Sequence, residues 1–273
     1  MLKYDYSVVG ASGFIGSNMV NFLEKLGFNV LKIGRNLEEI KVDHLGVVVY
    51  CAGFGDCLNN PNNVIDANVS FLSEVLNKFS YDKLFYISST RVYLDNQSGA
   101  EKSALKLSMG DSRRLFNLTK LTAEALISQY DNAIALRVSN VYGNAFKSPL
   151  FLPSIVRDAI SKKVMNIYTT PNYAKDYINV EDVCTVIYQL SQIENLQHKV
   201  YNLASGKNIS SEQIVSTIVN KTDTDVIWHD VKHEDQFPPI SIKRIQQEIN
   251  YNPSSVLHDL GEMINLFSVK FHE

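Results

Sequence analysis

The sequence predicts an α/β fold with a doubly wound parallel sheet and a smaller lobe towards the C-terminus. Short apolar runs alternate with longer helical patterns through the first half of the chain. The run Val47–Cys51 is apolar on both faces, as a strand buried inside a parallel sheet must be. Because crossovers between parallel strands are right-handed, this alternation leaves the doubly wound sheet as the expected topology.

The first half of the chain contains the elements of this predicted sheet. Each expected strand is a short run rich in β-branched and aromatic residues, and each expected helix is a longer stretch between turn signals. Strands are expected over 6–9, 29–33, 47–51, 84–87 and 133–138. Helices are expected from the first glycine-rich turn to about residue 26, over 64–79 and over 113–129.

The pattern becomes less regular after about Gly143. Six of the seven prolines lie beyond this point, where shorter helices are expected over 154–162, 180–192, 210–219 and 256–267. Proline interrupts helices and sheets, so this part of the chain should be less regular. We therefore expect a first domain over 1–145 and a smaller lobe over 146–273, with 176–192 packing back on the first domain.

Composition and charge exclude several classes of protein. Hydrophobic residues make up 45% of the 273 residues, which is enough for a core and rules out a disordered chain. The net charge is −3, so we expect no nucleic-acid partner and no membrane partner. No apolar stretch approaches the roughly 18 residues of a membrane span. Three cysteines without a C-x-x-C pair or a signal peptide indicate reduced thiols and a cytoplasmic location.

The histidines give little reason to expect a metal site. His229 and His233 are four residues apart, a spacing that would let them share a metal on a helix. The sequence around them does not predict a helix, and no cysteine lies nearby. We expect two surface histidines and no metal.

A glycine-rich turn follows the first strand directly and opens a helix. In such a turn one glycine permits the tight bend, one lets the backbone approach a pyrophosphate, and one lets the helix pack closely on the strand. The N–H groups at the helix start can then bind phosphates. We therefore expect a dinucleotide in a Rossmann-type domain over 1–145, although a turn without a ligand is the alternative. The expected contacts are Gly10, Ser12, Gly13, Phe14, Ile15 and Gly16.

The end of the second strand indicates which dinucleotide is bound. An NAD site usually places an acidic residue there to accept hydrogen bonds from the ribose 2′-hydroxyl. This chain has Gly34-Arg35-Asn36 instead. An arginine suits a 2′-phosphate by its charge and fork geometry, so we expect NADP(H) rather than NAD(H), with a solvated loop arginine as the alternative.

Five segments in order resemble the extended short-chain dehydrogenase/reductase family, which includes nucleotide-sugar epimerases, dehydratases and reductases. The first is the glycine turn, whose G-x-x-G-x-x-G spacing is the one found in that family. The second resembles the strand-end serine segment, and the third resembles the segment that passes the nicotinamide. The fourth is similar to the family's R-D-Y-x-x-V-x-D-V, and the fifth matches the landmark that follows it. These four segments are 87–93, 136–143, 175–183 and 201–206.

The resemblance implies a role for individual residues. Ser89 is expected to hold and polarise a keto oxygen, and Lys120 to hold the nicotinamide ribose. Ala52 and Val138 are expected to contact the cofactor. Lys175 stands where the family usually has an arginine for the diphosphate, and lysine lacks the bidentate fork. The expected substrate contacts are Thr90, Asn140, Lys175, Lys232 and Asp235.

The catalytic pair of the family, Y-x-x-x-K, differs here at one position. The matching segment is F-N-L-T-K, with Phe116 in place of the tyrosine and Lys120 in place. The four-residue spacing puts both side chains on one helix face, where the lysine would lower the pKa of a tyrosine. Phenylalanine cannot transfer a proton. Three explanations remain: a deliberate Tyr→Phe variant of an active enzyme, transfer of the role to Ser89, Thr90, Tyr93 or a water, or a binding or regulatory relative without chemistry.

The residues after Ser89 indicate the reaction. Dehydratases of the family carry Asp-Glu where this chain has Thr90-Arg91, so dehydration is not expected. Arg35 and the short stretch over 34–46 favour a reductase. The resemblance thus implies NADPH-dependent reduction of a 4-keto (deoxy) nucleotide-sugar for a surface polysaccharide, in a homodimer formed through the Phe116 helix. A nucleotide-sugar epimerase and a non-catalytic NADP(H)-binding protein are the alternatives.

Overall fold

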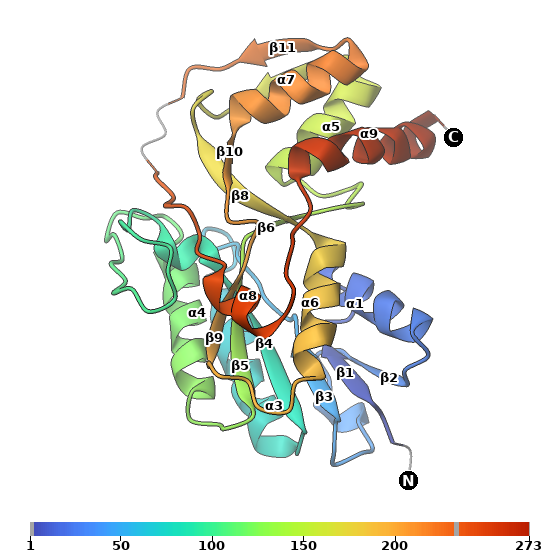
Figure 1. The fold of residues 1–273 in the computed structure, drawn as a ribbon, viewed down its shortest axis with the longest axis vertical. Coiled ribbons are helices and arrows are strands. Elements are labelled where there is room, and N and C mark those ends of the chain that lie inside the picture. Colours follow the sequence, from blue (N-terminus) through green and yellow to red (C-terminus); the bar gives the residue numbers. More distant parts are fainter. Residues whose placement is uncertain (1–2, 232–234, 273) are drawn as a thin grey trace.

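The computed structural model describes residues 3–231 and 235–272, and it confirms the predicted α/β fold. Figure 1 shows a parallel sheet with helices on both faces in the lower part of the molecule and a smaller lobe above it. The sheet order is β2-β1-β3-β4-β5-β9, and all pairings are parallel. The six strands are β1 (Tyr6–Val9), β2 (Val30–Ile33), β3 (Val47–Tyr50), β4 (Lys83–Ser89), β5 (Ala133–Val138) and β9 (Val200–Leu203).

The chain runs outward from β1 to β2 and then crosses back to β3. The carboxyl ends of β1 and β3 therefore form the switch point at which open α/β sheets bind ligands. The segment between β2 and β3 contains the 3₁₀ turn η1 (Leu37–Glu39) and adds no strand outside β2. β2 is therefore an edge strand of the sheet. The sixth strand, β9, was not predicted as a strand.

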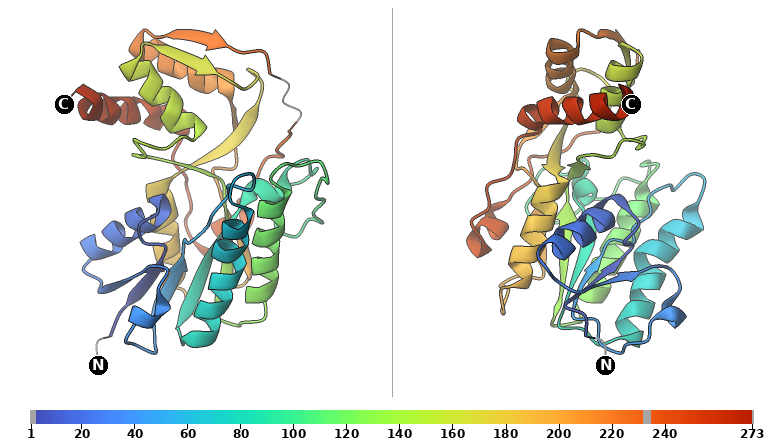
Figure 2. Two further views of the ribbon diagram at one scale, coloured as in Figure 1. Left: turned by 180° about the vertical axis from the view of Figure 1, so that it is seen from behind. Right: turned by 90° about the vertical axis from the view of Figure 1, so that its right-hand side faces the viewer.

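Helices cover both faces of the sheet, as Figure 2 shows from behind and from the side. Adjacent residues of a strand point to opposite faces, so Val8 packs with α1 and α6, whereas Val9 packs with α3 and α4. Each face thus has its own apolar core. The helices are α1 (Phe14–Lys25), α6 (Val180–Ser191) and α8 (Lys243–Glu248) on one face, and α3 (Phe71–Lys78) and α4 (Arg114–Ile127) on the other.

The helix predicted over 64–79 begins earlier and is not a single α-helix. It consists of α2 (Pro61–Ile65), the π-turn η2 (Asp66–Ser70) and α3. Within the π-turn Asn68 is fully buried, and its side-chain amide donates to Thr119 Oγ1 (3.0 Å) and to the Phe54 carbonyl (3.0 Å). π-turns are frequent at functional sites. Hydrophobic periodicity does not reveal one extra residue in a turn, so the sequence did not show it.

The upper lobe contains three helices around a separate core and five short strands that were not predicted. One sheet has the order β10-β8-β6, and β7 pairs with β11. No helix in the described part of the chain is long and apolar enough to span a membrane. The elements are α5 (Phe151–Ser161), α7 (Ser211–Thr222), α9 (Val256–His272), β6 (Asn140–Tyr142), β7 (Val164–Ile167), β8 (Ala174–Asn179), β10 (Asn208–Ser210) and β11 (Asp225–Trp228).

The chain passes between the two parts more than once. Within 176–192, α6 lies against α1 in the core of the main sheet (Figure 1). Further on, β9 joins the main sheet and α8 packs on its face. The division of the chain at residue 145 therefore stays a proposal.

A buried ion pair joins α4 to β5 beneath the carboxyl end of the sheet. Arg137 Nη2 lies 2.6 Å from Glu124 Oε2, and both side chains are more than nine-tenths buried. Arg137 Nη1 also donates to the Tyr93 hydroxyl (2.7 Å), which donates to Asn202 Oδ1 (2.8 Å). Ser88 completes the set by donating to Glu124 (2.5 Å). Helix α4 is thus connected by polar contacts to the three strands β4, β5 and β9.

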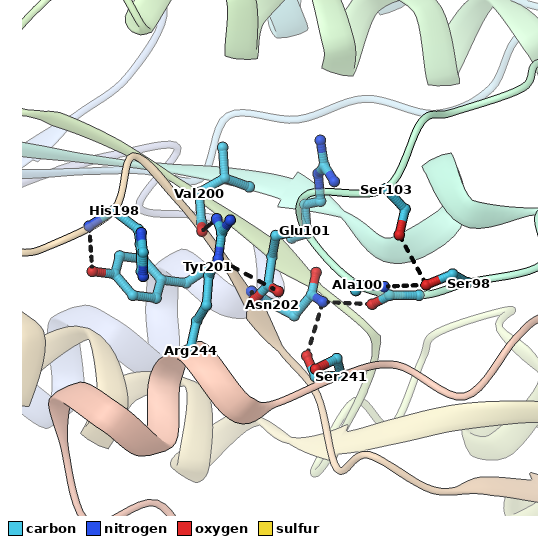
Figure 3. Close-up of polar contacts among 12 residues, drawn as sticks. Ser98, Ala100, Glu101, Ser103, His198, Val200, Tyr201, Asn202, Ser241 and Arg244 are labelled. Carbon is cyan, nitrogen blue, oxygen red and sulfur yellow. Dashed lines mark hydrogen bonds and ion pairs between the residues drawn. The ribbon is translucent and has the colours of Figure 1, made fainter.

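Asn202 on β9 also forms hydrogen bonds with two loops. Its side-chain amide donates to the carbonyls of Gly99 (2.8 Å) and Ser241 (2.9 Å), and its backbone N–H donates to Glu101 Oε1 (3.0 Å). Figure 3 shows Asn202 between Ser241 and Glu101. Arg244 of α8 donates to the Val200 carbonyl (3.0 Å). Two loops far apart in sequence are therefore attached to the same strand.

Removal of the carboxylate of this ion pair should strongly destabilise the fold. Glu124→Ala leaves Arg137 charged and buried, so we expect a loss of about 3–5 kcal/mol in the free energy of unfolding, measured by urea denaturation. The control is Asp158→Ala, which removes the partner of the exposed Lys162 and should cost under about 1 kcal/mol. Equal losses in both variants would contradict the structural role of the buried pair.

Candidate active site

The glycine turn is packed so closely that side chains are excluded from it. Gly10 has φ +78°, and a Cβ there would lie 2.7 Å from the Ala52 backbone nitrogen at the end of β3. A Cβ on Gly16 would lie 2.2 Å from the Gly10 carbonyl oxygen. Gly13 caps the start of α1, whose first N–H groups are therefore open to an anion. The turn thus has the form that a dinucleotide pyrophosphate needs.

A cavity of about 600 Å³ lies at the switch point beside this turn. The rest of its wall comes from the segments that follow β2 and β3, from α2, from the π-turn and from the start of α3. The expected contacts Gly10, Ser12, Gly13, Arg35 and Ala52 all line it. The residues present thus fit a dinucleotide, because the cavity is large and a glycine cradle lies at its edge.

The other expected cofactor residues do not line this cavity. Phe14 contacts the space beside Gly143, Ile15 packs against the core, and Gly16 packs on the turn itself. Val138 is buried at the end of β5.

Arg35 lies at the boundary between two cavities. It lines the cavity of the glycine turn and also a larger one, of about 1070 Å³, on the outer side of β2. The larger cavity lies beside β2, which is the edge strand of the sheet. Lys32 and Lys41 also line it. A group that extends from the first cavity towards the second would therefore pass Arg35, and the outer cavity is also lined by Glu39 and Asp43.

Lys120 lies directly behind the wall of the dinucleotide cavity. Its Nζ donates to the Ile87 carbonyl (2.8 Å) and lies 4.7 Å from the centre of the Tyr86 ring. A Cβ on Gly53, which lines the cavity, would be 3.1 Å from this amine. Burial lowers the pKa of Lys120 to about 7, and the nearby Cys51 and Glu124 only partly oppose that shift.

The Phe116 ring lies between two cations on the same face of α4. The Arg113 guanidinium is 4.7 Å from the ring centre, and Lys120 Nζ is 5.6 Å from it. These residues are three positions before and four positions after Phe116, so the helical repeat places all three together. A Cβ on Gly55 would lie 2.9 Å from Arg113 Nη2. The ring that replaces the tyrosine thus lies against two basic side chains.

Ser89 and Thr90 lie at the carboxyl end of β4, where the family resemblance placed them. Ser89 Oγ accepts a hydrogen bond from the Arg91 N–H (3.1 Å) and caps the 3₁₀ turn η3 (Thr90–Tyr93). Thr90 is buried. Tyr93 is also buried, and its hydroxyl is held between Arg137 and Asn202. Tyr93 is therefore committed to the ion-pair network described above.

The expected substrate residues come from both parts of the molecule. Asn140 is exposed at the start of β6, and its side-chain amide donates to the Asp176 carbonyl (2.8 Å). Lys175 lies on β8 with its Nζ over the rings of Tyr173 (4.7 Å) and Phe237 (5.5 Å). The negative charge of Asp235 raises the pKa of Lys175, which burial lowers. Lys232 lies outside the described residues.

Several residues of the site were not identified from the sequence. Arg113 could have been found from its spacing, because it is one helical turn before Phe116. Asn68 could not, because the π-turn that buries it leaves no periodic signal. Tyr173 and Phe237 meet at Lys175 from segments more than sixty residues apart, a proximity that only the fold creates.

The described residues show no cluster of three or more metal-ligating side chains. His229 Nε2 is instead 2.8 Å from Asn166 Oδ1, and its ring stacks on Tyr168 with the centres 4.3 Å apart. His233 lies outside the described residues.

Comparison with known proteins identifies the family. The model of the NAD dependent epimerase/dehydratase family matches residues 6–204, which is well over half of the chain. The chain belongs to this family. The resemblance found in the sequence is therefore confirmed, and with it the expectation of a pyridine nucleotide cofactor.

Individual relatives are more distant. The chain is 24% identical over 257 residues to CDP-abequose synthase of Salmonella typhimurium, covering 80% of this chain and 81% of that protein. The structure of MoeE5 in complex with UDP-glucose and NAD has a TM-score of 0.85 at 19% identity, covering 98% of this chain and 99% of that one. RMD from Pseudomonas aeruginosa complexed with NADPH has a TM-score of 0.79 at 19% identity, covering 97% and 99%. The two structures show the shared fold.

The buried amine should make stability depend on pH. The pKa of Lys120 falls from 10.5 to about 7 in the folded chain, so between these values the unfolded chain holds a proton that the folded chain lacks. The free energy of unfolding should therefore rise with pH over this window, relative to Lys120→Met. Urea denaturation of both proteins from pH 6.5 to pH 10 measures the difference. A difference that does not change with pH would contradict the low pKa.

Proposed function

We propose that the protein reduces a 4-keto nucleotide-sugar with NADPH, in the biosynthesis of a deoxysugar for a surface polysaccharide. The observation that carries the proposal is the position of Arg35 in the wall of the dinucleotide cavity, together with Gly10 and Ala52. An arginine at this position can form charge-assisted hydrogen bonds with a 2′-phosphate. NADPH is a reductant, so the cofactor chosen by Arg35 favours reduction.

Two further observations support reduction over dehydration. Where the dehydratases carry an acid and a base, this chain has the buried Thr90 and Arg91, and Arg91 forms an ion pair with Asp111 (2.8 Å). Neither side chain is a carboxylic acid, and the Arg91 guanidinium is engaged with Asp111. The similarity to a CDP-abequose synthase over four-fifths of both chains is in keeping with deoxysugar chemistry.

The residues of the chain have separate tasks in this proposal. The glycine turn binds the pyrophosphate, Arg35 the 2′-phosphate, and Lys120 the ribose that adjoins the nicotinamide. When bound, the cofactor supplies a hydride to the keto carbon. Ser89, at the end of β4, holds the keto oxygen by a hydrogen bond and stabilises its developing negative charge. A water molecule supplies the proton that converts this oxygen to a hydroxyl, because Phe116 has none to give. Asn140 orients the sugar from the opposite side.

Two alternatives follow from specific features. Epimerisation would use the same site with a tightly held NAD, which Arg35 disfavours. A non-catalytic NADP(H)-binding role would follow if Phe116 is the natural residue and no other group supplies the proton. We also propose a homodimer through α4, because Leu118 on that helix and Ile65 on the neighbouring α2 are large apolar side chains that remain exposed in the single chain.

Replacement of Arg35 should change cofactor preference more than overall affinity. Arg35→Ala should weaken NADPH binding at least tenfold, because a charge-assisted contact with the 2′-phosphate is lost, and should leave NADH binding nearly unchanged. Fluorescence titration with both cofactors measures this. Lys32→Ala is the matched control, since this cation lines the outer cavity and pairs with Glu24. Equal losses of NADPH and NADH affinity would contradict the role of Arg35.

Restoring the hydroxyl at position 116 should raise activity. A positioned general acid contributes about 10²–10⁴-fold, so Phe116→Tyr should accelerate NADPH oxidation by that order with the right substrate. The assay follows NADPH absorbance with a panel of 4-keto nucleotide-sugars, and Phe271→Tyr, on the exposed side of α9, is the control. If Phe116→Tyr binds NADPH but gains no activity on any substrate, the reductase proposal fails and the non-catalytic role is favoured.

A further inference from the structure

The cavity of about 1070 Å³ beside β2, called here the outer cavity, extends along the whole strand. Arg35 and Asn36 line it after the carboxyl end of β2, and Tyr4 and His44 line it near the amino end. Figure 1 shows β2 as the outermost strand of the main sheet. The crossover between two parallel strands usually contains an α-helix. Here the crossover to β3 contains only the turn η1, so no helix covers this side of β2.

The floor of the outer cavity is aliphatic. Leu31, Ile40 and Val42 line it, and each is only half-buried. On their inner side they pack against the core between the sheet and the helices α3 and α4. Their outer side faces the cavity, so an apolar group that lies on them is removed from water, which is favourable.

The rim of the outer cavity carries more positive than negative charge. The side chains of Lys3 and Arg35 form no hydrogen bond or ion pair with the described residues, whereas Glu39 accepts from Asn36 Nδ2 (2.8 Å). An organic anion therefore complements the cavity. A second copy of the chain would bring the same cations together, which is unfavourable. The charged residues of the lining are Lys3, Lys32, Arg35, Lys41, Glu39 and Asp43.

Arg35 connects the outer cavity to the dinucleotide cavity. Of the residues that line the outer cavity, only Gly34 and Arg35 also line the other one. Arg35 is therefore the one side chain that both cavities share. One guanidinium cannot direct its planar fork into two cavities at once, and two anions beside it repel each other. Anionic groups bound in the two cavities should therefore weaken each other's binding.

We propose that the outer cavity binds a small organic anion, with its apolar body on the aliphatic floor and its acidic group at Arg35, in competition with the 2′-phosphate of NADPH. The site itself does not depend on the proposed function, but the competition rests on the role proposed there for Arg35. Because coupling between two sites is reciprocal, the ligand and NADPH weaken each other by the same factor. The ligand thus acts against NADPH binding and leaves NADH binding nearly unchanged.

Two fluorescent probes with one apolar body test the site without any cofactor. The first is 8-anilinonaphthalene-1-sulfonate, and the second is N-phenyl-1-naphthylamine, which lacks the sulfonate. The sulfonate probe should bind at least about tenfold more tightly, because it gains a charge-assisted contact with Arg35. Arg35→Gln should remove most of this difference and leave the affinity for the uncharged probe nearly unchanged.

A charge reversal distinguishes the outer cavity from the dinucleotide cavity. Lys41→Glu alters only the outer cavity, so it should weaken the sulfonate probe several-fold and leave NADP⁺ binding nearly unchanged. Lys270→Glu is the matched control, because this exposed lysine of α9 lines neither cavity. It should change neither affinity.

The oxidised cofactors test the competition, since they differ from each other by the 2′-phosphate alone. Saturating NADP⁺ should weaken the sulfonate probe about tenfold or more, whereas saturating NAD⁺ should change its affinity less than about twofold. The uncharged probe should respond to neither cofactor. Fluorescence titration measures all four combinations.

The outcomes separate the inference from the proposed function. Equal affinity for the two probes, or equal displacement of the sulfonate probe by NAD⁺ and NADP⁺, overturns the anion site. A Lys41→Glu variant that changes its association state in sedimentation, with no change in probe affinity, overturns it in favour of a second copy. Bound NADP⁺ that does not weaken the sulfonate probe overturns the competition. If neither cofactor binds the wild-type protein, the proposed function fails, while the probe difference and Lys41→Glu still decide on the site.

Discussion

The buried pair of Glu124 and Arg137 is the interaction on which the site depends most. It connects α4 to β5, while Ser88 and Tyr93 connect the same charges to β4 and η3. An ion pair this deeply buried costs desolvation energy, and removal of one partner costs more than the pair itself contributes. Its geometric effect is to fix the face of α4 that carries Phe116 and Lys120 against the ends of two strands. The buried charges, together with apolar packing, therefore fix the position of the part of α4 that carries Phe116 and Lys120.

A second constraint is the close approach of backbone segments around the dinucleotide cavity. Gly10 and Gly16 leave no room for side chains between β1, α1 and the end of β3. On the far side, Gly53 and Gly55 leave room for the long side chains of Lys120 and Arg113. The first pair brings backbone segments together, whereas the second pair makes room for two cationic side chains. The glycines thus determine where backbone and where cationic side chains line the site.

The substitution of the tyrosine changes how the site handles charge. A tyrosine beside a cation can release a proton, but a phenylalanine there only offers its ring face to the cation. Here the ring has Arg113 on one side and Lys120 on the other, and burial already lowers the pKa of Lys120. Two basic side chains therefore adjoin the ring that replaces the tyrosine of the family.

The sequence by itself determined the parallel sheet, five of its strands and the position of the glycine turn, because these follow from local periodicity and from spacing along one segment. It also determined that Phe116 and Lys120 share a helix face. Only the tertiary structure decided the π-turn that buries Asn68, the return of β9 to the main sheet, and the contact of Lys175 with Phe237. Lys175 and Phe237 come from segments distant in sequence, and no local pattern encodes a distance that depends on how strands and helices pack.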